Sequence, residues 1–246
     1  PALYAMRARR YMHEFGATVE QLAKVSVKAR SHGARNPDAQ FQKTVTVDEV
    51  LGSRPIADPL TLLQCCPTGD GAAAAIICAS DVAGQFEAEP VKILASELFS
   101  GKFTNGFRDM TSMEIAVRGA GIAYEQAGLG PDDIDVAEVH DAFSIAELLY
   151  YEAFGFCERG EAVHLLESGE TTIGGKIVVN PSGGLLAKGH PIGGTGVAQV
   201  VEIVRQLRGH CGDRQVEGAK VGLTHATGGG AMGMDSGACS IHIFAR

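Results

Sequence analysis

Apolar residues recur at helical spacing in several segments of this chain, and glycine or a capping sequence marks their ends. Residues 1–16 place their apolar side chains on one broad face, and Gly16 is the expected C-terminal stop. Capping boxes at Thr18–Gln21 and Thr46–Glu49 predict the starts of two more helices, of which the first ends near Gly33. The same periodicity predicts further helices over residues 113–127, 143–154 and 197–208.

Short apolar runs between these helices predict strands. They lie at residues 91–95, 134–139, 176–179, 220–224 and 238–244. Strands and helices alternate along the second part of the chain, which ends in two consecutive strands. This pattern predicts a layered α/β fold with a mostly parallel sheet. The segment 155–172 is expected to be a loop.

The continuous apolar run Ala72–Ala79 follows a turn rich in glycine and aspartate. It predicts either a buried strand or a buried helix–strand unit, since periodicity alone does not separate the two. The polar connector 84–90 comes next and marks a domain boundary. Residues 1–89 are therefore expected to form one region and residues 90–246 a second.

The stretch Asn180–Gly196, NPSGGLLAKGHPIGGTG, is unusually rich in flexible residues. Six of its seventeen residues are glycine and two are proline, and each glycine costs ordering entropy on folding. Such a loop can bring backbone N–H groups close to a ligand. His190 lies in its middle beside Pro191, and the helix that follows offers free N–H groups to developing negative charge. A strand, a loop with a histidine and a helix start together predict a catalytic corner.

Two other histidines follow or end predicted strands. His140 comes directly after one strand and before a helix, where ligand-facing residues collect in open α/β sheets. A helix cap is the alternative interpretation, and the neighbouring Asp141 either caps that helix or holds a ring N–H. His225 ends a later strand, and the backbone N–H groups of the three glycines 228–230 after it can form an oxyanion pocket. A purely structural role for His225 stays open.

Composition narrows the classes of function. The chain has 246 residues, 45% of them hydrophobic and 20% charged, which is typical of a globular protein with an ample core. The formal net charge of −8 argues against non-specific nucleic-acid binding and gives no reason to expect an anionic membrane partner. Six cysteines at irregular spacing match neither a zinc site nor a disulfide framework, so we expect no bound metal and a reducing cytoplasm.

Three motifs, in the right order, resemble the thiolase superfamily. GHPIGGTG resembles its GHP motif, and the whole stretch from Asn180 looks most like the sterol-carrier-protein branch. HDAF at His140–Phe143 resembles the HDCF motif of that branch, and His225–Gly230 resembles its glycine-rich C-terminal turn. The resemblance implies a thiolase-like layered α/β/α fold with a mostly parallel mixed sheet, in which the N-terminal half of the fold is incomplete.

The resemblance also implies roles for single residues. The imidazole at the position of His190 polarises a thioester carbonyl and helps activate a nucleophilic cysteine, and the one at His140 helps bind the thioester oxygen. His225 is the third candidate catalytic residue. Contacts to the oxyanion or to coenzyme A are expected from Ser182, Lys188, Gly228 and Gly229. Coenzyme A enters as a substrate, and no cofactor is implied. The basic residues within 1–35 either form a solvated helix face or meet the phosphates of coenzyme A.

The chain departs from the family pattern at its reactive thiols. Ala142 stands where the HDCF motif has its cysteine, and no cysteine follows His225, where other thiolases have an acid/base thiol. Cys65 and Cys66 lack a helix N-terminus that would lower a thiol pKa, so we interpret both as structural. The nucleophilic cysteine of thiolases lies in the first half of their fold, which this sequence does not match. The expectation is therefore a fragment, or one polypeptide of a split enzyme.

Three functions are compatible with the sequence. The first is thiolytic cleavage of 3-oxoacyl-CoA, or the reverse Claisen condensation, by a thiolase-type acyltransferase. The second is retro-aldol cleavage of a 3-hydroxyacyl-CoA, which Ala142 favours because the thiol for proton transfer at the α-carbon is missing. The third is a non-catalytic acyl-CoA-binding subunit. The family implies a homodimer and, in some relatives, a small zinc-containing OB-fold partner; neither nucleic acid nor a membrane is expected as a partner.

Overall fold

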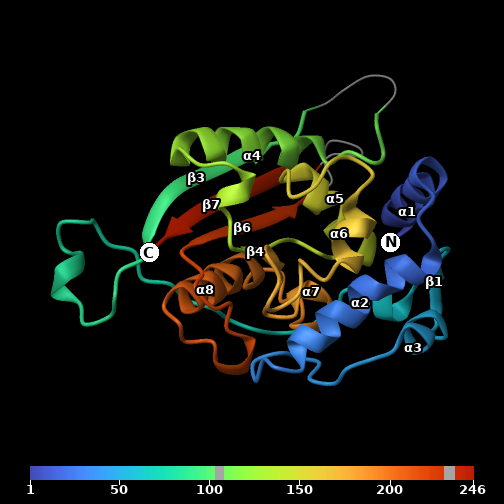
Figure 1. The fold of residues 1–246 in the computed structure, drawn as a ribbon, viewed down its shortest axis with the longest axis horizontal. Helices are drawn as coiled ribbons and strands as arrows, with labels where there is room; N and C mark the ends of the chain where they lie inside the picture. The colour runs from blue at the N-terminus through green and yellow to red at the C-terminus, as the bar shows by residue number, and fades with distance from the viewer. Residues whose placement is uncertain (103–107, 230–235) are drawn as a thin grey trace.

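The computed structural model describes residues 1–102, 108–229 and 236–246, and its centre is one five-stranded sheet with helices on both faces (Figure 1). The strands of this sheet are β3 (Lys92–Ser100), β4 (Val136–Glu138), β5 (Val178–Val179), β6 (Val221–Gly228) and β7 (Ala238–Ala245). A separate two-stranded ribbon consists of β1 (Pro55–Ala57) and β2 (Leu60–Thr61). The helices are α1 (Ala2–Phe15), α2 (Val19–Gly33), α3 (Val47–Leu51), α4 (Glu114–Ala127), α5 (Ser144–Ala153), α6 (Ala162–Glu167), α7 (Gly184–Ala187) and α8 (Thr195–Leu207).

The strands of the large sheet lie in the order β3-β7-β6-β4-β5. β4 pairs in parallel with β5 and β6, whereas β7 pairs antiparallel with β3 and β6. The other four strands therefore run in one direction and β7 runs against them, which confirms the mostly parallel mixed sheet. The carboxyl ends of β4, β5 and β6 consequently lie at the same edge of the sheet, where ligand sites form in open α/β folds.

Local capping explains where several helices begin and end. Thr18 Oγ1 accepts the Gln21 backbone N–H at 3.3 Å, and the Gln21 side chain accepts the Thr18 N–H at 2.9 Å. Thr46 and Glu49 form the same reciprocal pair at the start of α3. Gly16 ends α1 with φ 72°, a left-handed conformation that glycine adopts without strain. These boundaries are confirmed as the sequence predicted them.

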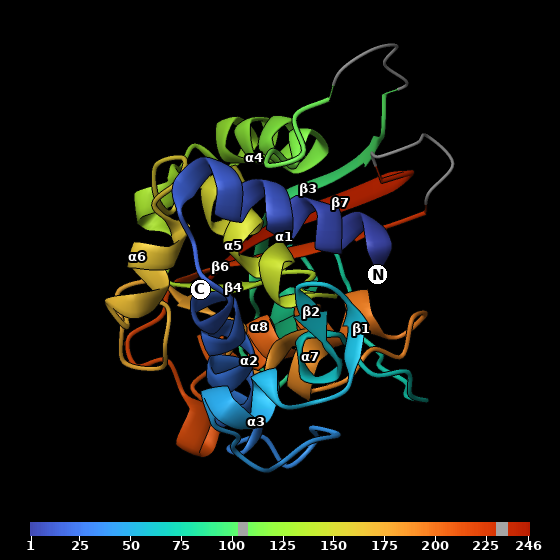
Figure 2. The same cartoon turned by 90° about the vertical axis from the view of Figure 1, so that its right-hand side faces the viewer.

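Hydrophobic cores cover both faces of the sheet. On one face α4 packs against β3 and β7, and α5 lies beside α4. On the other face α8 packs against β4 and β6, so closely that a Cβ added at Gly222 would lie 2.5 Å from Ile203 Cγ2. Figure 1 shows α4 and α8 on opposite sides of the strands. Figure 2 shows α1, α2 and α3 together at one end of the sheet, where α2 packs against α5, α6 and α7.

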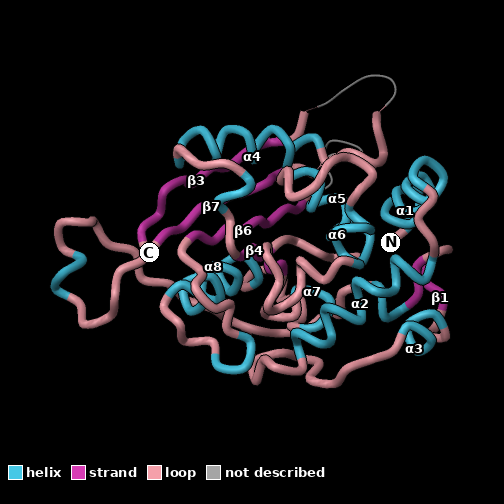
Figure 3. Tube along the Cα trace, viewed as in Figure 1, coloured by secondary structure: helices cyan, strands magenta, loops and turns pink. Residues whose placement is uncertain are grey.

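The prediction for Ala72–Ala79 was wrong. This run forms neither a strand nor a helix, and its largest side chains are exposed, Ile76 by 89% and Ile77 by 77%. Figure 3 draws the chain between β2 and β3 mostly as loop, and the part around the short 3₁₀ turn Ala83–Gln85 projects from the body of the molecule. Apolar composition predicts burial only if a partner surface exists, and no described segment covers Ile76 or Ile77.

Two further boundaries differ from the prediction. The expected loop 155–172 contains α6, whose buried Ala162, Val163 and Leu166 pack into the larger core. β6 and β7 are longer than predicted, and residues 230–235 between them, including Gly230, lie outside the described part of the chain. Among the described residues, no helix combines the length and the apolar character needed to cross a bilayer.

Candidate active site

The structure brings the three predicted histidines together from three distant segments. His140 follows β4, His190 precedes α8 and His225 belongs to β6. The rings of His140 and His190 lie edge to face, with 5.0 Å between their centroids and 89° between their planes. The backbone N–H of His140 donates to His225 Nδ1 at 3.4 Å. These three residues therefore lie together at the carboxyl edge of the sheet.

His225 lies beneath the other two rings. Its side chain is fully buried and packs against Tyr150, with 4.3 Å between ring centroids, and against Phe154 at 5.2 Å. Because Nδ1 accepts from the His140 N–H, Nε2 carries the ring proton, and Nε2 has no hydrogen-bond partner among the described residues. Burial, followed by the proximity of His140, holds the pKa of His225 well below its usual value. His225 thus supports the His140 backbone as a neutral ring.

His140 and His190 are also held neutral. Burial lowers the pKa of His140 to about 3, and the neighbouring His190 and Lys188 add to the effect. Burial likewise lowers the pKa of the half-buried His190, with a further contribution from Lys188. His140 Nδ1 is buried without a hydrogen-bond partner in the described structure. A pair of neutral imidazoles can accept a proton or donate a hydrogen bond at neutral pH, which suits acyl chemistry.

The glycine-rich stretch begins with a strained asparagine that is held from three sides. Asn180 has φ 56°, a value that residues other than glycine rarely adopt. Its N–H donates to Ala137 O at 2.7 Å, its Oδ1 accepts the Val139 N–H at 2.8 Å, and its Nδ2 donates to Glu147 at 2.7 Å. These bonds tie β4 to β5 and fix the direction in which the stretch leaves the sheet.

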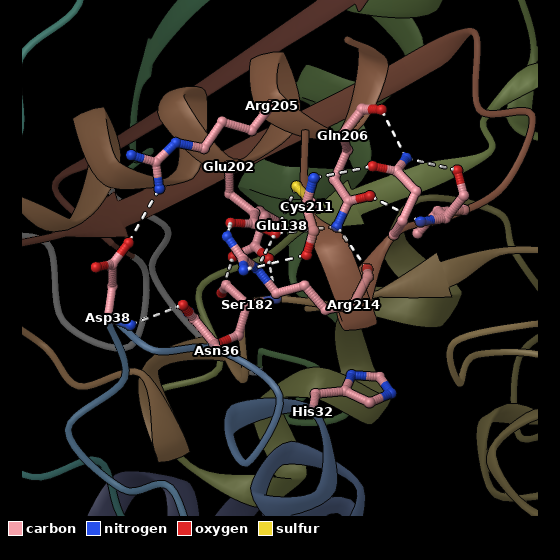
Figure 4. Close-up of polar contacts among 12 residues, drawn as sticks. His32, Asn36, Asp38, Glu138, Ser182, Glu202, Arg205, Gln206, Cys211 and Arg214 are labelled. Carbon is pink, nitrogen blue, oxygen red and sulfur yellow. Dashed lines mark hydrogen bonds and ion pairs between the residues drawn. The ribbon is translucent and has the colours of Figure 1, made fainter. Parts of the chain in front are cut away.

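Buried carboxylates hold the next part of the stretch. Glu138 accepts the Ser182 N–H at 3.0 Å and the Ser182 hydroxyl at 2.8 Å (Figure 4). Asp141 accepts the Leu185 N–H at 2.6 Å, so it caps α7 rather than the helix that follows it or a ring nitrogen. The segment from Asn180 to Ala187 is buried throughout, which corrects the expectation that its backbone faces a ligand. Ser182 is fully buried in this segment with its hydroxyl bonded to Glu138, and its contact with the oxyanion or coenzyme A stays a prediction.

Figure 4 shows a second acidic group near Glu138. Glu202 of α8 forms a buried ion pair with Arg214, with Nε–Oε1 at 3.0 Å and Nη2–Oε2 at 3.1 Å. Burial, and then the charge of Glu202, raises the pKa of Glu138 to about 7. The floor of the site is therefore a network of buried polar groups, each tied to backbone or to an opposite charge.

The remaining predicted binding residues lie closer to the surface. Lys188 is partly exposed and its Nζ donates to Gly189 O at 3.4 Å. Gly228 and Gly229 are exposed at the end of β6, and Gly229 has φ 76°. The glycine pair is separated from His225 by two residues along the same strand. Their role in binding an oxyanion or coenzyme A stays a prediction.

The segment that contains Cys65 and Cys66, two cysteines that we interpreted as structural, lies across the site. The Cys66 N–H donates to Ala142 O at 2.9 Å, and Thr68 forms a parallel bridge with His190. Beyond Thr68, residues 69–73 and 191–194 line a pocket of about 380 Å³ beside His190. Periodicity gives no signal for such an irregular segment; the only hint was its turn sequence PTGDG.

Most basic residues of the first two helices already have partners. Lys28 and Arg7 are buried and bond inside the fold, Lys28 to Glu147 and Arg7 to backbone carbonyls. Arg9, Arg10 and Lys24 are exposed and each pairs with a nearby carboxylate. Contact of this region with coenzyme A stays a prediction. The described residues contain no group of three or more His, Cys, Asp or Glu placed to hold a metal ion.

The layered sheet and the three histidines at its carboxyl edge together define a thiolase-like α/β protein. The chain belongs to the thiolase C-terminal domain-like family, since the model of that family matches residues 100–239. It is 50% identical over 247 residues to an acetyl-CoA acetyltransferase of Methanothermobacter thermautotrophicus, covering 100% of this chain and 63% of that protein. It is 47% identical to the benzoylsuccinyl-CoA thiolase subunit BbsB of Thauera aromatica, covering 92% of this chain and 60% of the relative.

Sterol carrier protein 2 of Oryctolagus cuniculus is also similar, with 46% identity over 94% of this chain and 44% of that protein. This chain thus spans between 44% and 63% of the length of these relatives. Among solved structures, an Ltp2-ChsH2(DUF35) aldolase superposes with a TM-score of 0.84 at 30% identity, covering 98% of this chain and 62% of that one. A monomeric SCP2-thiolase like protein of Mycobacterium smegmatis, at 18% identity, 100% and 51% coverage and TM-score 0.70, shares the fold.

Proposed function

We propose that this chain is the histidine-bearing part of a thiolase-type acyltransferase that acts on acyl-CoA thioesters. The reaction would be thiolysis of a 3-oxoacyl-CoA by coenzyme A, or the reverse Claisen condensation. One observation carries the proposal: the rings of His140 and His190 meet at 5.0 Å between centroids at the carboxyl edge of the sheet. The kinship with an acetyl-CoA acetyltransferase and a thiolase subunit supports it.

In this proposal His190 is the general base and His140 stabilises charge. His190 accepts the proton of the attacking thiol, and the resulting imidazolium donates to the thioester oxygen as that oxygen becomes negative. His140, whose ring faces His190, is placed to bind the same oxygen. The pocket lined by residues 69–73 and 191–194 receives the thioester end of the acyl-CoA. Lys188 and the glycine pair Gly228 and Gly229 contact the substrate at its rim.

Neither Cys65 nor Cys66, the two thiols in the segment that bridges to Ala142 and Phe143, is set up as the nucleophile. Burial raises the pKa of Cys65, and it raises the pKa of Cys66 to about 11, with a further contribution from Asp141. Both thiols stay protonated at neutral pH, so neither is an activated nucleophile. We propose that the nucleophilic cysteine comes from the thiolase half that relatives contain and that this chain does not match.

The test is a thiolysis assay on a protein in which this chain is joined to, or assembled with, a thiolase half that bears the cysteine. Loss of 3-oxoacyl-CoA absorbance is followed in the presence of coenzyme A. Replacing the general base, His190→Ala, should lower kcat/KM by about 100-fold or more. His210→Ala, an exposed histidine past the far end of α8, is the matched control and should leave the rate unchanged. Equal rates for both variants would contradict the proposal.

A second candidate, retro-aldol cleavage of a 3-hydroxyacyl-CoA, is favoured by a specific pair of observations. Ala142 removes the thiol that thiolases of this branch use for proton transfer, and the chain superposes on an aldolase with a TM-score of 0.84. Under this alternative, thiolysis of acetoacetyl-CoA fails, and a branched 3-hydroxyacyl-CoA releases an aldehyde or ketone that can be trapped and measured.

A third candidate is an acyl-CoA-binding subunit without catalysis of its own. The names of two relatives, a thiolase subunit and an Ltp2-ChsH2(DUF35) complex, support a partner polypeptide for this chain as well. Its identity, whether a second copy or a small zinc-containing OB-fold protein, belongs to the same proposal. Coenzyme A binding measured by calorimetry, without turnover in the completed assembly, would favour the binding subunit.

A further inference from the structure

The hydroxyl of Thr195 contacts the active-site histidine directly. Its Oγ1 lies 2.8 Å from His190 Nδ1 and 3.0 Å from the carbonyl oxygen of Pro191. Thr195 is buried and begins α8, and its own N–H donates to the same Pro191 oxygen at 2.8 Å. The backbone of the first helical turn therefore fixes where the hydroxyl sits, and the contact is a built part of the fold.

The hydrogen positions in this contact follow from its donors and acceptors. A hydroxyl has one hydrogen and two lone pairs, whereas a carbonyl oxygen only accepts. We assign the Thr195 hydrogen to Pro191 O, 3.0 Å away, which also accepts the N–H groups of Gly194 and Thr195 at 2.8 Å; otherwise two accepting oxygens would face each other with no hydrogen between them. Oγ1 then has only lone pairs to offer to the ring, so His190 Nδ1 carries a proton. Since partial burial and the nearby Lys188 lower the pKa of His190, the half-buried ring is neutral at neutral pH and its Nε2 holds a lone pair.

We propose that Thr195 is a positioning residue that fixes His190 in the tautomer with its proton on Nδ1, so that Nε2 is the base. A neutral histidine side chain in water favours the proton on Nε2, so this tautomer is one that the site selects. In serine proteases a carboxylate sets the tautomer of the catalytic histidine. The hydroxyl of Thr195 sets the tautomer of His190 without adding a negative charge. The catalytic meaning of this inference rests on the proposed function, whereas the tautomer is a property of this chain alone.

The tautomer can be observed directly by NMR. Long-range ¹H–¹⁵N correlations of the ¹⁵N-histidine-labelled chain separate protonated from unprotonated ring nitrogens, and the signals missing in His190→Gln assign the residue. At neutral pH, His190 should show a protonated Nδ1 and an unprotonated Nε2. Thr195→Val should shift the population toward the proton on Nε2, and Thr195→Ser should keep the wild-type pattern. The backbone amide spectrum confirms that each variant is folded.

The wild-type spectrum alone can overturn the inference, so it does not depend on how the valine variant folds. A proton on Nε2 of His190 in the wild type would refute it. So would an unchanged tautomer in a folded Thr195→Val protein. If the assembled wild-type enzyme has no thiolase activity although His190 carries its proton on Nδ1, the result counts against the proposed function and leaves this inference standing.

The assembled enzyme supplies a second readout. Thr195→Val should lower kcat by about tenfold to hundredfold, with little change in KM, because the base is misoriented while the substrate contacts remain. Thr195→Ser should restore most of the rate. The acid limb of the pH profile should move to lower pH in the valine variant, because the hydroxyl no longer accepts from the imidazolium. His140 and Lys188 lie near the same ring and are unchanged in both variants. A loss without this pH shift and without rescue by serine would mean a structural role only.

Discussion

Replacing Lys28 by methionine tests the buried ion pair that supports the site. Lys28 Nζ lies 2.7 Å from Glu147 Oε1 and donates to Val179 O at 2.9 Å and to the Tyr151 hydroxyl at 3.0 Å. Glu147 in turn accepts from the Tyr151 hydroxyl and from Asn180, which begins the glycine-rich stretch. Methionine keeps most of the length of the lysine stem and removes its charge, so Glu147 stays buried without its cation.

The cost can be worked out from the buried position of the pair. Breaking a buried ion pair by removing one partner costs about 3–5 kcal/mol, because the remaining charge is left uncompensated. The lost bond to Val179 O adds about 1 kcal/mol. Lys28→Met should thus lower the free energy of unfolding by about 4–6 kcal/mol.

The assay is urea-induced unfolding of the chain at neutral pH. The matched control is Lys24→Met on the same helix, because Lys24 is largely exposed and its pairing with Glu167 should contribute less than about 1 kcal/mol. The double variant Lys28→Met/Glu147→Gln should recover part of the loss, since it leaves no buried charge. A loss below about 1 kcal/mol for Lys28→Met, or no recovery in the double variant, would refute this reasoning.

Two further predictions concern the packing beneath the histidines. Gly184→Ala should lower the free energy of unfolding by about 2–4 kcal/mol in a urea titration, because φ is 60° and the new Cβ would lie 2.3 Å from Asp141 Oδ2. The control is Gly121→Ala in α4, where the space around the glycine is open. This variant should be neutral or stabilising by up to about 1 kcal/mol. Because the pKa of Glu138 is raised to about 7, its contribution to stability is complete below the ordinary pKa and is lost as pH rises through 7. Glu138 should therefore cause about 2.5 kcal/mol of the loss in free energy of unfolding that the wild type shows between pH 5 and pH 8, and Glu138→Gln should lack this part of the loss. An unchanged pH profile in the variant would contradict the assignment.

The parts of the fold that sequence predicted well are those governed by local chemistry. Thr18 and Thr46 stand three residues before a glutamine and a glutamate, and both reciprocal caps form as expected. Gly16 and Gly128 end their helices in the left-handed conformation that only glycine adopts freely. Such signals need no knowledge of distant residues, so they can be interpreted from a few neighbours along the chain.

The run Ala72–Ala79 shows where local reasoning stops. Its composition fits a buried strand, yet Ile76 and Ile77 face outward because no described segment pairs with the run. Burial depends on what lies opposite, and that is a property of the whole assembly. The short helices α6 and α7 were missed for a related reason: helices of six and four residues are too short for periodicity, and tertiary contacts hold them in place.

At the site, the glycines of the stretch Asn180–Gly196 were compatible with two structural roles that the sequence alone could not separate. Glycine permits a ligand to approach the backbone, and it equally permits two backbones to pack together. Gly183 serves packing, since a Cβ there would lie 2.8 Å from the Cα of Gly33, and Gly184 leaves room for Asp141. The first half of the stretch is therefore core, where Glu138 and Asp141 accept hydrogen bonds from Ser182 and Leu185. In the proposed function, chemistry begins only at His190, whose Nδ1 lies 2.8 Å from the hydroxyl of Thr195, so a residue five positions downstream belongs to the same hydrogen-bonded unit.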